Sequence, residues 1–455
     1  MAAAPASAAP TTTIAAIATA PSAGGIGVIR LSGTRSAEIA KKLTGKALKK
    51  RFFHFVAFRD EGGNVVDRGL AVWFAAPRSF TGEDVVELHA HGSPVVLNLL
   101  LRRLLALGAQ QARAGEFSER AFLNGKIDLA QAEAVADLIA SGSEVAARAA
   151  MRSLEGDFSR QVQEIFDALV RLRAWLEAAL DFPEEEVDFL SSPQLAAQLV
   201  EVQTRVATMI EATKRGVMLR DGLHVVIVGR PNVGKSSLLN ALARSERAIV
   251  TEIPGTTRDV LREAVSLDGI GITLVDTAGL REAADVVEQE GIRRARAELV
   301  RADVAILVTE NDDASKDREL LREVEASAKR IVVHNKIDRR GGEPRIESTG
   351  EAETAIHLSA QTGAGLDLLR AELMRLAGRP DGTQGAFSAR RRHVDAMQRV
   401  AEHLNNASTQ LHEQRAGELA AEELRAAQHA LGEINGEYTS DDLLGAIFST
   451  FCIGK

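Results

Sequence analysis

Residues 229 to 236 read Gly229-Arg230-Pro231-Asn232-Val233-Gly234-Lys235-Ser236 and follow an apolar segment, 223–228, that predicts a β-strand. The spacing is that of a phosphate-binding loop, in which glycines let backbone N–H groups surround an oligophosphate. Lys235 would reach the outer phosphates, and the Ser236 hydroxyl would ligate Mg²⁺. A helix is expected directly afterwards, over residues 237–243. The stretch therefore predicts a nucleotide-binding α/β domain.

Three later segments specify the nucleotide. Asp276-Thr277-Ala278-Gly279 ends a predicted strand, where a carboxylate can hold the Mg²⁺ shell and a glycine amide can meet the γ-phosphate. Asn335-Lys336-Ile337-Asp338 follows another predicted strand, and its carboxylate can accept two hydrogen bonds from guanine, whereas adenine would leave that anion unpaired. Ser359-Ala360-Gln361 fits a loop whose backbone closes over the base. GTP is therefore preferred over ATP.

The group that would orient the attacking water is not the usual one. In Ras-like enzymes a glutamine just after the Asp-x-x-Gly segment has this role, but here the position holds Leu280. Leucine cannot orient water, so either hydrolysis is very slow or another polar group supplies the function. The nearest acidic candidates are Glu282, Asp285, Glu288 and Glu290.

The segment 250–259 carries threonines that could bind Mg²⁺ and close the site, and Thr257 is favoured as the metal ligand. Arg258 and Arg262 could act as arginine fingers, but both lie beyond Thr257, so a solvated or domain-contacting role is favoured. The side-chain oxygen of Asn232 could instead help to hold a monovalent cation. Such a cation would neutralise charge between the β- and γ-phosphates.

Length and composition limit the remaining possibilities. At 455 residues the chain should form two to four domains. Its net charge of −8 argues against extensive coating of nucleic acid, and the local basic clusters at 41–51 and 390–392 are interpreted as solvated faces. No stretch has the length of a membrane span, so a soluble protein is expected. The Ala/Pro/Thr-rich residues 1–13 predict a disordered tail and not a secretion signal.

Cys452 is the single cysteine of the chain and lies in Phe451-Cys452-Ile453-Gly454-Lys455. A single cysteine excludes an internal disulfide and suits a reducing, cytoplasmic environment. Two interpretations remain open for its thiol. It is either a small buried or idle group or a reactive thiolate helped by the nearby Lys455.

The sequences on either side of the nucleotide-binding segment have different patterns of apolar residues. The N-terminal part has short β-like runs at 26–31, 52–58, 70–74 and 85–89, and a helix with Ser93 as its N-cap. The apolar face predicted for that helix consists of Val96, Leu99, Leu100 and Leu104. Residues 128–215 have helical spacing broken at 181–183 and at 191–193, and residues 385–451 resume it. A GTPase inserted into one helical domain is therefore expected.

The predicted fold class is multidomain, α/β and α. The expected parts are a tail at 1–13, an α+β module at 14–126, the first part of a helical domain at 127–215, an inserted Ras-like GTPase domain at 216–378 and the second helical part at 379–455.

From about Ile14 to its last residue the chain resembles the MnmE (TrmE) family of tRNA modification GTPases. The segments that carry the resemblance are Gly24–Arg30, Phe80–Leu88, Gly115–Lys126, Pro254–Asp259 and Phe451–Lys455. The resemblance implies a homodimer that works with a flavoprotein, MnmG, on certain tRNAs. Together they would add a carboxymethylaminomethyl or aminomethyl group to carbon five of the wobble uridine. The one-carbon unit would come from a 5-formyl- or 5,10-methylene-tetrahydrofolate bound by the N-terminal module, which would also form the dimer.

The resemblance also assigns roles to residues. It implies Glu288 as the acid that orients water, Cys452 as a candidate catalytic thiol, Ser236 and Thr257 as Mg²⁺ ligands and GTPase activation by K⁺. The implied K⁺ ligands are Asn232, Thr251, Ile253 and Thr256, and the implied folate contacts are Arg30, Glu87, Lys126 and Lys455. The complete expected GTP-binding set is Asn232, Val233, Gly234, Lys235, Ser236, Ser237, Thr251, Glu252, Ile253, Pro254, Gly255, Thr256, Thr257, Asp276, Thr277, Ala278, Gly279, Asn335, Lys336, Asp338, Ser359, Ala360 and Gln361.

Two other functions remain open. A GTPase switch in ribosome or ribonucleoprotein assembly would share the nucleotide domain, but it should also carry an RNA-binding module or a strongly basic extension. A folate-dependent one-carbon transferase with a regulatory GTPase would share the N-terminal module. Modification of tRNA by the chain alone, without a flavoprotein, would favour the transferase. We expect none, because no sequence feature supplies a redox cofactor site.

Overall fold

The computed structural model describes residues 12–181, 193–243, 262–267, 270–276, 302–311, 314–315, 317–321, 328–348, 353–376, 386–438, 440–451 and 453–454. It divides into two compact units. The first unit contains Met1–Ala136, Ser153–Ala207 and Asp395–Lys455, and the second contains Asp137–Arg152 and Thr208–Val394.

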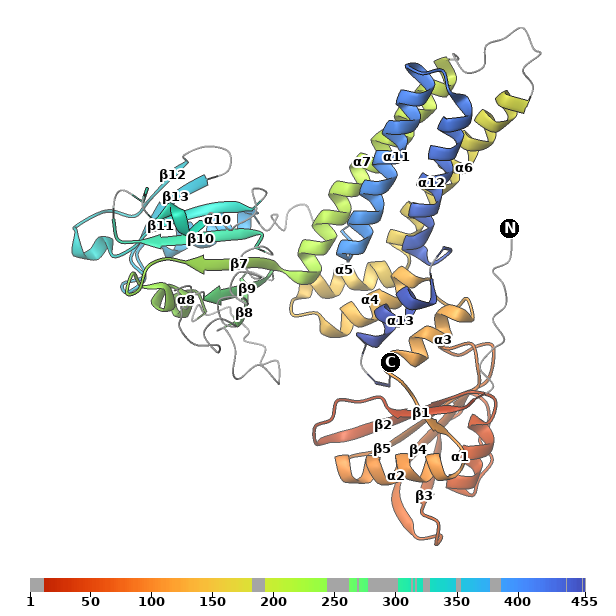
Figure 1. Cartoon of the computed structure of the whole chain (residues 1–455). Helices are drawn as coiled ribbons and strands as arrows, with labels where there is room; N and C mark the ends of the chain where they lie inside the picture. The colour runs from red at the N-terminus through yellow and green to blue at the C-terminus, as the bar shows by residue number, and fades with distance from the viewer. Residues whose placement is uncertain are drawn as a thin grey trace, which may run out of the picture. The chain divides into compact units, whose positions relative to one another are not determined.

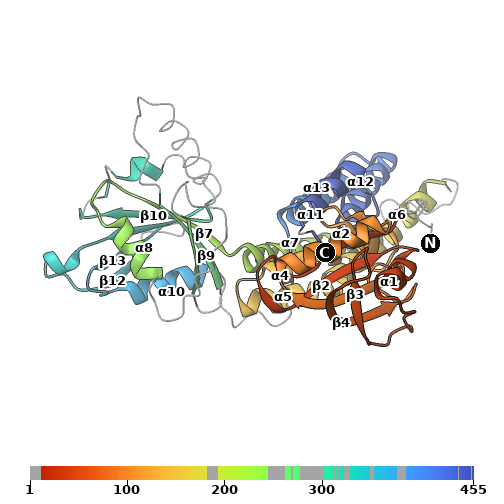
Figure 2. The same cartoon turned by 90° about the horizontal axis from the view of Figure 1, so that it is seen from below.

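A six-stranded sheet forms the N-terminal part of the first unit, in the order β3-β4-β5-β2-β1-β6 (Figure 1). Its strands are β1 (Ile14–Ile17), β2 (Gly24–Ser32), β3 (His54–Arg59), β4 (Val65–Phe74), β5 (Val85–Gly92) and β6 (Gln110–Gln111). Helices α1 (Ser36–Thr44) and α2 (Pro94–Ala106) share one core with this sheet and lie close together in both views (Figures 1 and 2). The four runs predicted here are strands, whereas β1, β6 and α1 were not predicted.

The predicted apolar face of α2 is partly wrong. Leu97, Leu100, Leu101 and Leu104 are buried, whereas Leu99 is exposed. The buried positions follow the i, i+3, i+4, i+7 spacing of one helix face, and that face meets the sheet. In a helix with apolar residues on almost every side, only the position of the sheet decides which leucines are buried.

Helices make up the rest of the first unit, and α4, α5, α7 and α11 contribute residues to both units. The predicted breaks at 181–183 and 191–193 agree with the end of α6 and the start of α7. Two further breaks were missed, between α4 and α5 and between α5 and α6. The helices are α3 (Glu116–Leu123), α4 (Leu129–Ala140), α5 (Glu144–Leu154), α6 (Asp157–Asp181), α7 (Pro193–Asp221), α11 (Arg391–His412), α12 (Gly417–Asn435) and α13 (Asp441–Ser449).

The C-terminal helices of the first unit pack against segments far away in the chain. Arg173 of α6 donates a 2.5 Å hydrogen bond to Gln428 of α12. Phe448 of α13 packs with Leu129 of α4 in one apolar cluster. At the end of the chain, Ile453 forms a β-bridge with Ala114. The penultimate residues thus lie against the N-terminal module.

The second unit contains a seven-stranded sheet in the order β12-β13-β11-β10-β7-β9-β8 (Figure 1). Strands β13, β11, β10, β7 and β9 are parallel, and the edge strands β12 and β8 are antiparallel to their neighbours. Its elements are β7 (Leu223–Val228), α8 (Lys235–Ala243), β8 (Arg262–Leu267), β9 (Ile270–Asp276), β10 (Val304–Thr309), η2 (Arg318–Leu321), β11 (Lys329–His334), η3 (Ile337–Arg339), β12 (Arg345–Ser348), β13 (Glu353–His357) and α10 (Leu366–Leu376).

Both faces of this sheet are buried, as a parallel sheet requires. On one face, Val225 and Ile227 of β7 pack with Leu238 of α8 and Leu369 of α10. On the other face, Val226 and Val228 belong to a second apolar cluster. Successive residues of β7 therefore point to opposite cores, which explains its uninterrupted apolar sequence. The second unit thus contains the α/β domain with a mostly parallel sheet that the Ras-like prediction requires.

Asp137 of α4 ties together the two segments that lead into and out of the GTPase part of the second unit. Its carboxylate, which is 5% exposed, accepts hydrogen bonds from Arg220 Nε (2.7 Å), Ser388 Oγ (2.7 Å) and Arg390 Nη2 (2.9 Å). Arg220 precedes β7, and the other two residues precede α11. A Cβ on Gly216 would lie 2.6 Å from the carbonyl oxygen of Phe387, so only glycine allows this close approach.

None of the helices within the described ranges is long and apolar enough to cross a membrane.

Candidate nucleotide-binding site

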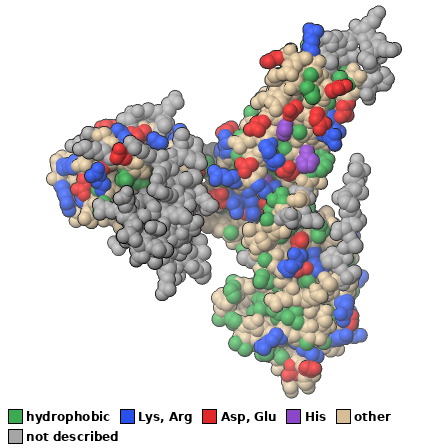
Figure 3. Space-filling view, in the orientation of Figure 1, with side chains coloured by type: hydrophobic (Ala, Val, Ile, Leu, Met, Phe, Trp, Pro, Cys, Tyr) green, Lys and Arg blue, Asp and Glu red, His purple; other side chains and the backbone are tan. Residues whose placement is uncertain are grey.

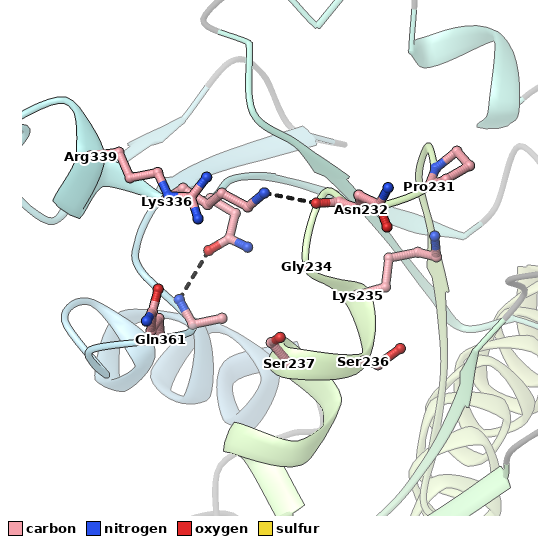
Figure 4. Close-up of a pocket in the computed structure, with 11 residues that line it drawn as sticks. Pro231, Asn232, Gly234, Lys235, Ser236, Ser237, Lys336, Arg339 and Gln361 are labelled. Carbon is pink, nitrogen blue, oxygen red and sulfur yellow. Dashed lines mark hydrogen bonds between the residues drawn. The ribbon is translucent and has the colours of Figure 1, made fainter.

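A cavity of about 710 Å³ opens at the carboxyl ends of β7, β11 and β13 (Figure 4). In the sheet, β7 lies between β9 and β10, so the chain continues on one side of β7 and then crosses to the other. Parallel α/β sheets bind ligands at such a switch point. The cavity is lined by Pro231, Asn232, Gly234, Lys235, Ser236, Ser237, Asn335, Lys336, Arg339, Ala360 and Gln361.

The loop between β7 and α8 has an unusual backbone. Asn232 has a φ of 63° and Gly234 a φ of 100°, both in the left-handed region. A Cβ on Gly234 would lie 2.3 Å from Asn335 Nδ2. Glycine at 234 therefore satisfies two requirements at once, a backbone turn and the close approach of a second loop.

Lys235, Ser236 and Ser237 form the first turn of α8, and the N-terminus of a helix attracts anions through its backbone N–H groups and its dipole. The Lys235 side chain is 8% exposed, and its ammonium donates to the carbonyl oxygens of Gly229 (3.0 Å) and Arg230 (3.1 Å). The same end of the cavity thus holds a fixed positive charge and two serine hydroxyls. These groups suit a chain of phosphates.

Asn335 connects the two ends of the cavity. Its side chain is buried; Nδ2 donates to the carbonyl oxygen of Val233 (2.8 Å), and Oδ1 accepts from the backbone N–H of Ala360 (2.9 Å, Figure 4). One amide thereby joins the phosphate-binding loop to the loop predicted to close over the base. An asparagine can do this because its amide carries a donor and an acceptor side by side.

Two charged contacts brace the same loops. Lys336, with a φ of 65°, donates from Nζ to the carbonyl oxygen of Asn232 (2.7 Å) and pairs with Glu310. Arg230 Nε donates to the buried carboxylate of Asp317 (2.5 Å). Of the four described non-glycine residues with positive φ, two lie at this cavity. Such strained residues are typical of ligand sites.

The structure brings together much of the predicted GTP set. Asn232, Gly234, Lys235, Ser236, Ser237, Asn335, Lys336, Ala360 and Gln361 line one cavity. Val233 and Ser359 are buried behind them, and Asp338 lies exposed in η3, next to the lining residue Arg339.

Other predicted residues cannot be placed. Asp276 is the last residue of β9 and pairs in register with Ile227, two residues before Gly229, but its side chain is outside the description. The residues that lie entirely outside the described ranges are Thr251, Glu252, Ile253, Pro254, Gly255, Thr256, Thr257, Thr277, Ala278, Gly279, Glu288, Cys452 and Lys455, together with Arg258, Leu280, Glu282, Asp285 and Glu290.

The sequence reasoning missed three residues at this site. Pro231 and Arg339 line the cavity, and Glu310 pairs with Lys336. Arg339 could have been found, because it directly follows the Asn-Lys-Ile-Asp segment. Glu310 could not, because its pairing depends on β10 and β11 being neighbours in the sheet.

The three described members of the predicted folate set lie in the first unit. Arg30 of β2 and Glu87 of β5 are cross-strand partners, and Arg30 Nη2 donates to Glu87 Oε1 at 2.9 Å. Arg30 also lies over the ring of Phe80, at 5.8 Å from its centroid. Lys126 is exposed and donates to the carbonyl oxygen of Pro77 (3.1 Å). Arg30 and Lys126 therefore contact the same loop, residues 77–82.

The chain matches two family models. Residues 13–126 match the model described as GTP-binding protein TrmE N-terminus, and residues 129–452 match that of the MnmE helical domain. The tRNA modification GTPase MnmE of Methylococcus capsulatus is 52% identical over 97% of this chain and 98% of its own length. That of Xanthomonas campestris pv. campestris is 54% identical over 97% of this chain and 99% of its own. Among solved structures, the G domain of the T. maritima FeoB iron transporter covers 34% of this chain at 25% identity, with a TM-score of 0.27 that supports no conclusion. With two relatives above half identity over almost the whole chain and a nucleotide cavity of the expected make-up, the chain belongs to the MnmE (TrmE) family of tRNA modification GTPases.

Proposed function

We propose that the chain is a K⁺-activated GTPase that modifies tRNA together with the flavoprotein MnmG. The pair would add a carboxymethylaminomethyl or aminomethyl group to carbon five of the wobble uridine, with a one-carbon unit from tetrahydrofolate. The observation that carries the GTPase part is the bridge made by Asn335 between the phosphate-binding loop and the base loop. The tRNA part rests on the family, whose relatives are named tRNA modification GTPases.

Each end of the cavity would recognise a different part of GTP. The first turn of α8 and Lys235 would hold the phosphates by N–H groups and charge. At the other end, Asp338 would accept from the N1–H and amino group of guanine. Binding of GTP by both ends would stabilise the Asn335 bridge, because each half of the bridge belongs to a loop that contacts the nucleotide.

Two of the residues proposed to hold Mg²⁺ and K⁺, Ser236 and Asn232, are described, and both carry oxygen atoms that suit these ions. Ser236 supplies a hydroxyl in the first turn of α8, the position that ligates Mg²⁺ in phosphate-binding loops. Asn232 is exposed to the cavity, and its side-chain amide offers a neutral oxygen of the kind that K⁺ takes. K⁺ would add positive charge where the γ-phosphate leaves. In this proposal Glu288 orients water, and Thr251, Ile253, Thr256 and Thr257 complete the two metal sites.

The N-terminal module has groups suited to a folate. Arg30 and Lys126 flank the loop 77–82 with two cations, and Glu87 supplies a carboxylate beside Arg30. Cations would bind the glutamate tail and the carboxylate would accept from the pterin. Gly454, two residues after Cys452, lies so close to β1 that a Cβ on it would be 2.3 Å from the carbonyl oxygen of Ile17. This contact supports a role for the chain end, including Cys452 and Lys455, at the same module.

The homodimer is supported by an exposed apolar surface on the N-terminal sheet. Phe55 of β3 and Leu70 of β4 are cross-strand partners, and they are 67% and 40% exposed. Phe53, just before β3, is also exposed and lies edge-on to His89 of β5. Contiguous exposed aromatic and aliphatic side chains are typical of a protein interface. A second copy of the chain is the occupant we propose.

GTP hydrolysis in K⁺ and in Na⁺ at equal ionic strength tests the central part of this proposal. We expect K⁺ to raise the rate roughly tenfold or more, which corresponds to about 1.4 kcal/mol of barrier, and Asn232→Ala to lose that stimulation. Asn98→Ala, a change at an exposed helix position, should keep it. Equal wild-type rates in both salts would reject the K⁺ mechanism. An assay for modified uridine in tRNA, with the chain, MnmG and a tetrahydrofolate present, tests the proposed tRNA reaction.

A further inference from the structure

Arginine side chains concentrate on the second unit around α5 and the end of α7. In Figure 3 this region appears as a group of blue, basic side chains, whereas basic and acidic side chains are mixed over the rest of the visible surface. We define the basic surface by four residues, Arg148 and Arg152 of α5, Arg215 of α7 and Arg391 at the start of α11. The concentration is notable because the whole chain has a net charge of −8.

Packing within the second unit brings together the three segments that carry these arginines, α5, the end of α7 and the residues just before α11. Arg148 and Arg152 line a cavity of about 340 Å³ together with Leu219 of α7 and Ala386. Arg215 lies one helical turn before Leu219 and therefore on the same side of α7. Ser388, close to Arg391 in the chain, donates its backbone N–H to the carbonyl oxygen of Ala149 (3.1 Å). The surface thus depends on tertiary structure and is not visible as a run of charge.

The protein does not neutralise most of this charge. In the part of the chain that the structure describes, Arg152 Nη1 is buried with no hydrogen-bond partner, and Arg215 and Arg391 form no ion pair. Among the ion pairs of the described residues, Arg148 alone of the four has a carboxylate partner, Glu144 (2.5 Å), and both of those side chains are more than 70% exposed. An exposed pair of this kind is worth little and can be exchanged for another anion.

Two acidic groups of the second unit, on α4 and α7, are paired with arginines that do not belong to the basic surface. Asp137 is already shared by Arg220 and Arg390, and Asp221 pairs with Arg220. Both carboxylates are therefore matched by arginines outside the basic surface. Among the ion pairs of the described residues, the exposed Glu144 is therefore the one carboxylate that a ligand would have to displace from a defining arginine.

We infer that the basic surface binds the phosphate backbone of RNA. Guanidinium groups match phosphate oxygens with paired N–H donors, and release of counterions from a polyanion favours binding to several arginines at once. The inference rests on the proposed function, in which the substrate is a tRNA, and adds the surface that would hold it. The sequence alone favoured a solvated face for residues 390–392. The packing of residues 386–388, just before Arg391, against α5 and α7 is the observation that changes this interpretation.

Binding of unfractionated tRNA to the full chain, measured by fluorescence anisotropy at several salt concentrations, tests the inference. A fourfold variant, Arg148→Gln, Arg152→Gln, Arg215→Gln and Arg391→Gln, removes the charge. We expect its affinity to fall at least tenfold and the slope of log affinity against log salt to decrease by roughly two to four, about one for each lost phosphate contact. GTP hydrolysis without tRNA should stay unchanged, which shows that the variant folds.

The matched control removes the same charge elsewhere, by Arg102→Gln, Arg171→Gln, Arg205→Gln and Arg425→Gln at exposed helix positions. It should bind tRNA like the wild type. Equal affinities of the two variants, or no binding of tRNA by the wild type, would overturn the inference. So would polyglutamate of equal charge that competes as well as tRNA, because the surface would then suit an acidic protein. Uridine modification with MnmG is scored separately and tests the proposed function.

Discussion

At the scale of single residues, the nucleotide site depends on groups with unusual backbone or hydrogen-bonding demands. Asn335 uses both halves of its amide, Asn232 and Lys336 adopt positive φ, and Gly234 has no room for a side chain. Each of these residues lies in a loop, where backbone groups are not consumed by a strand or helix. The site is therefore a set of loops held in place by a rigid parallel sheet.

Gly234→Ala should weaken GTP binding. The new Cβ would lie 2.3 Å from Asn335 Nδ2, and the alanine would have to adopt a φ of 100°, which is unfavourable for any residue with a side chain. Strain of this kind costs about 1–3 kcal/mol, which corresponds to roughly a tenfold loss of affinity or more. Titration of each protein with a fluorescent guanine nucleotide measures this affinity. Gly142→Ala, where a Cβ would meet no atom within 4 Å, is the control, and an unchanged affinity of Gly234→Ala would contradict the argument.

At the scale of elements, the prediction from sequence was most accurate where one strand or helix has one consistent signal. The boundaries of β7 agree to the residue, because both faces of the strand are buried and its apolar run has sharp ends. Strand β6 has only two residues, Gln110 and Gln111, and carries no pattern of its own. It exists because β1 offers it a parallel edge. In α2, contact with the sheet determines that Leu97 is buried and Leu99 is exposed, which the apolar pattern of the helix does not show.

The contact between α10 and β13 predicts a pH-dependent contribution to stability. Glu372 accepts from Arg375 Nε (2.7 Å) and from Thr354 of β13 (3.0 Å), and its side chain is 6% exposed. The hydrogen bond from Arg375 lowers the pKa of Glu372 despite the opposing effect of burial. A lowered folded-state pKa means that the contact stabilises the fold above the ordinary pKa of glutamate, about 4.3. This contribution is lost as the pH falls through the folded-state value.

Glu372→Gln should therefore lower the unfolding free energy by about 1 kcal/mol at pH 7, and the difference from the wild type should shrink below about pH 4. Calorimetric unfolding at a series of pH values measures this. Glu347→Gln is the matched control, because Arg345 also lowers the pKa of Glu347 by a hydrogen bond, but that pair is exposed. The control should leave the unfolding temperature unchanged at every pH. A difference for Glu372→Gln that grows toward acid would refute the assignment.

At the scale of the whole molecule, the chain combines two compact units that carry different candidate sites. The second unit holds the nucleotide cavity, and the first holds the N-terminal module with Arg30, Glu87 and the residues of the chain end. Asp137 binds both segments that flank the GTPase part, so movement of that part would act on one buried carboxylate. The domain boundaries at 126, 215 and 378 remain predictions.

The proposed homodimer gives a prediction at this scale. Phe55→Asp places a charge in the centre of the exposed apolar surface formed with Leu70 and Phe53. We expect the wild type to sediment as a dimer and this variant as a monomer in analytical ultracentrifugation, because an apolar interface cannot bury an unpaired carboxylate. Leu419→Asp, at a 56% exposed position of α12, is the control and should remain dimeric. A dimeric Phe55→Asp would show that the interface lies elsewhere.

What the sequence determined by itself is local. The phosphate-binding loop, the Asn-Lys-Ile-Asp segment and the strands before them could be found because each requirement is satisfied within a few neighbouring residues. Tertiary structure alone decided the contacts between distant segments. Examples are the Asn335 bond to Val233, the buried Arg120 between Glu83 and Glu116, and the assembly of the basic surface. Such contacts depend on which strands and helices become neighbours, and periodicity within one segment contains no information about its neighbours.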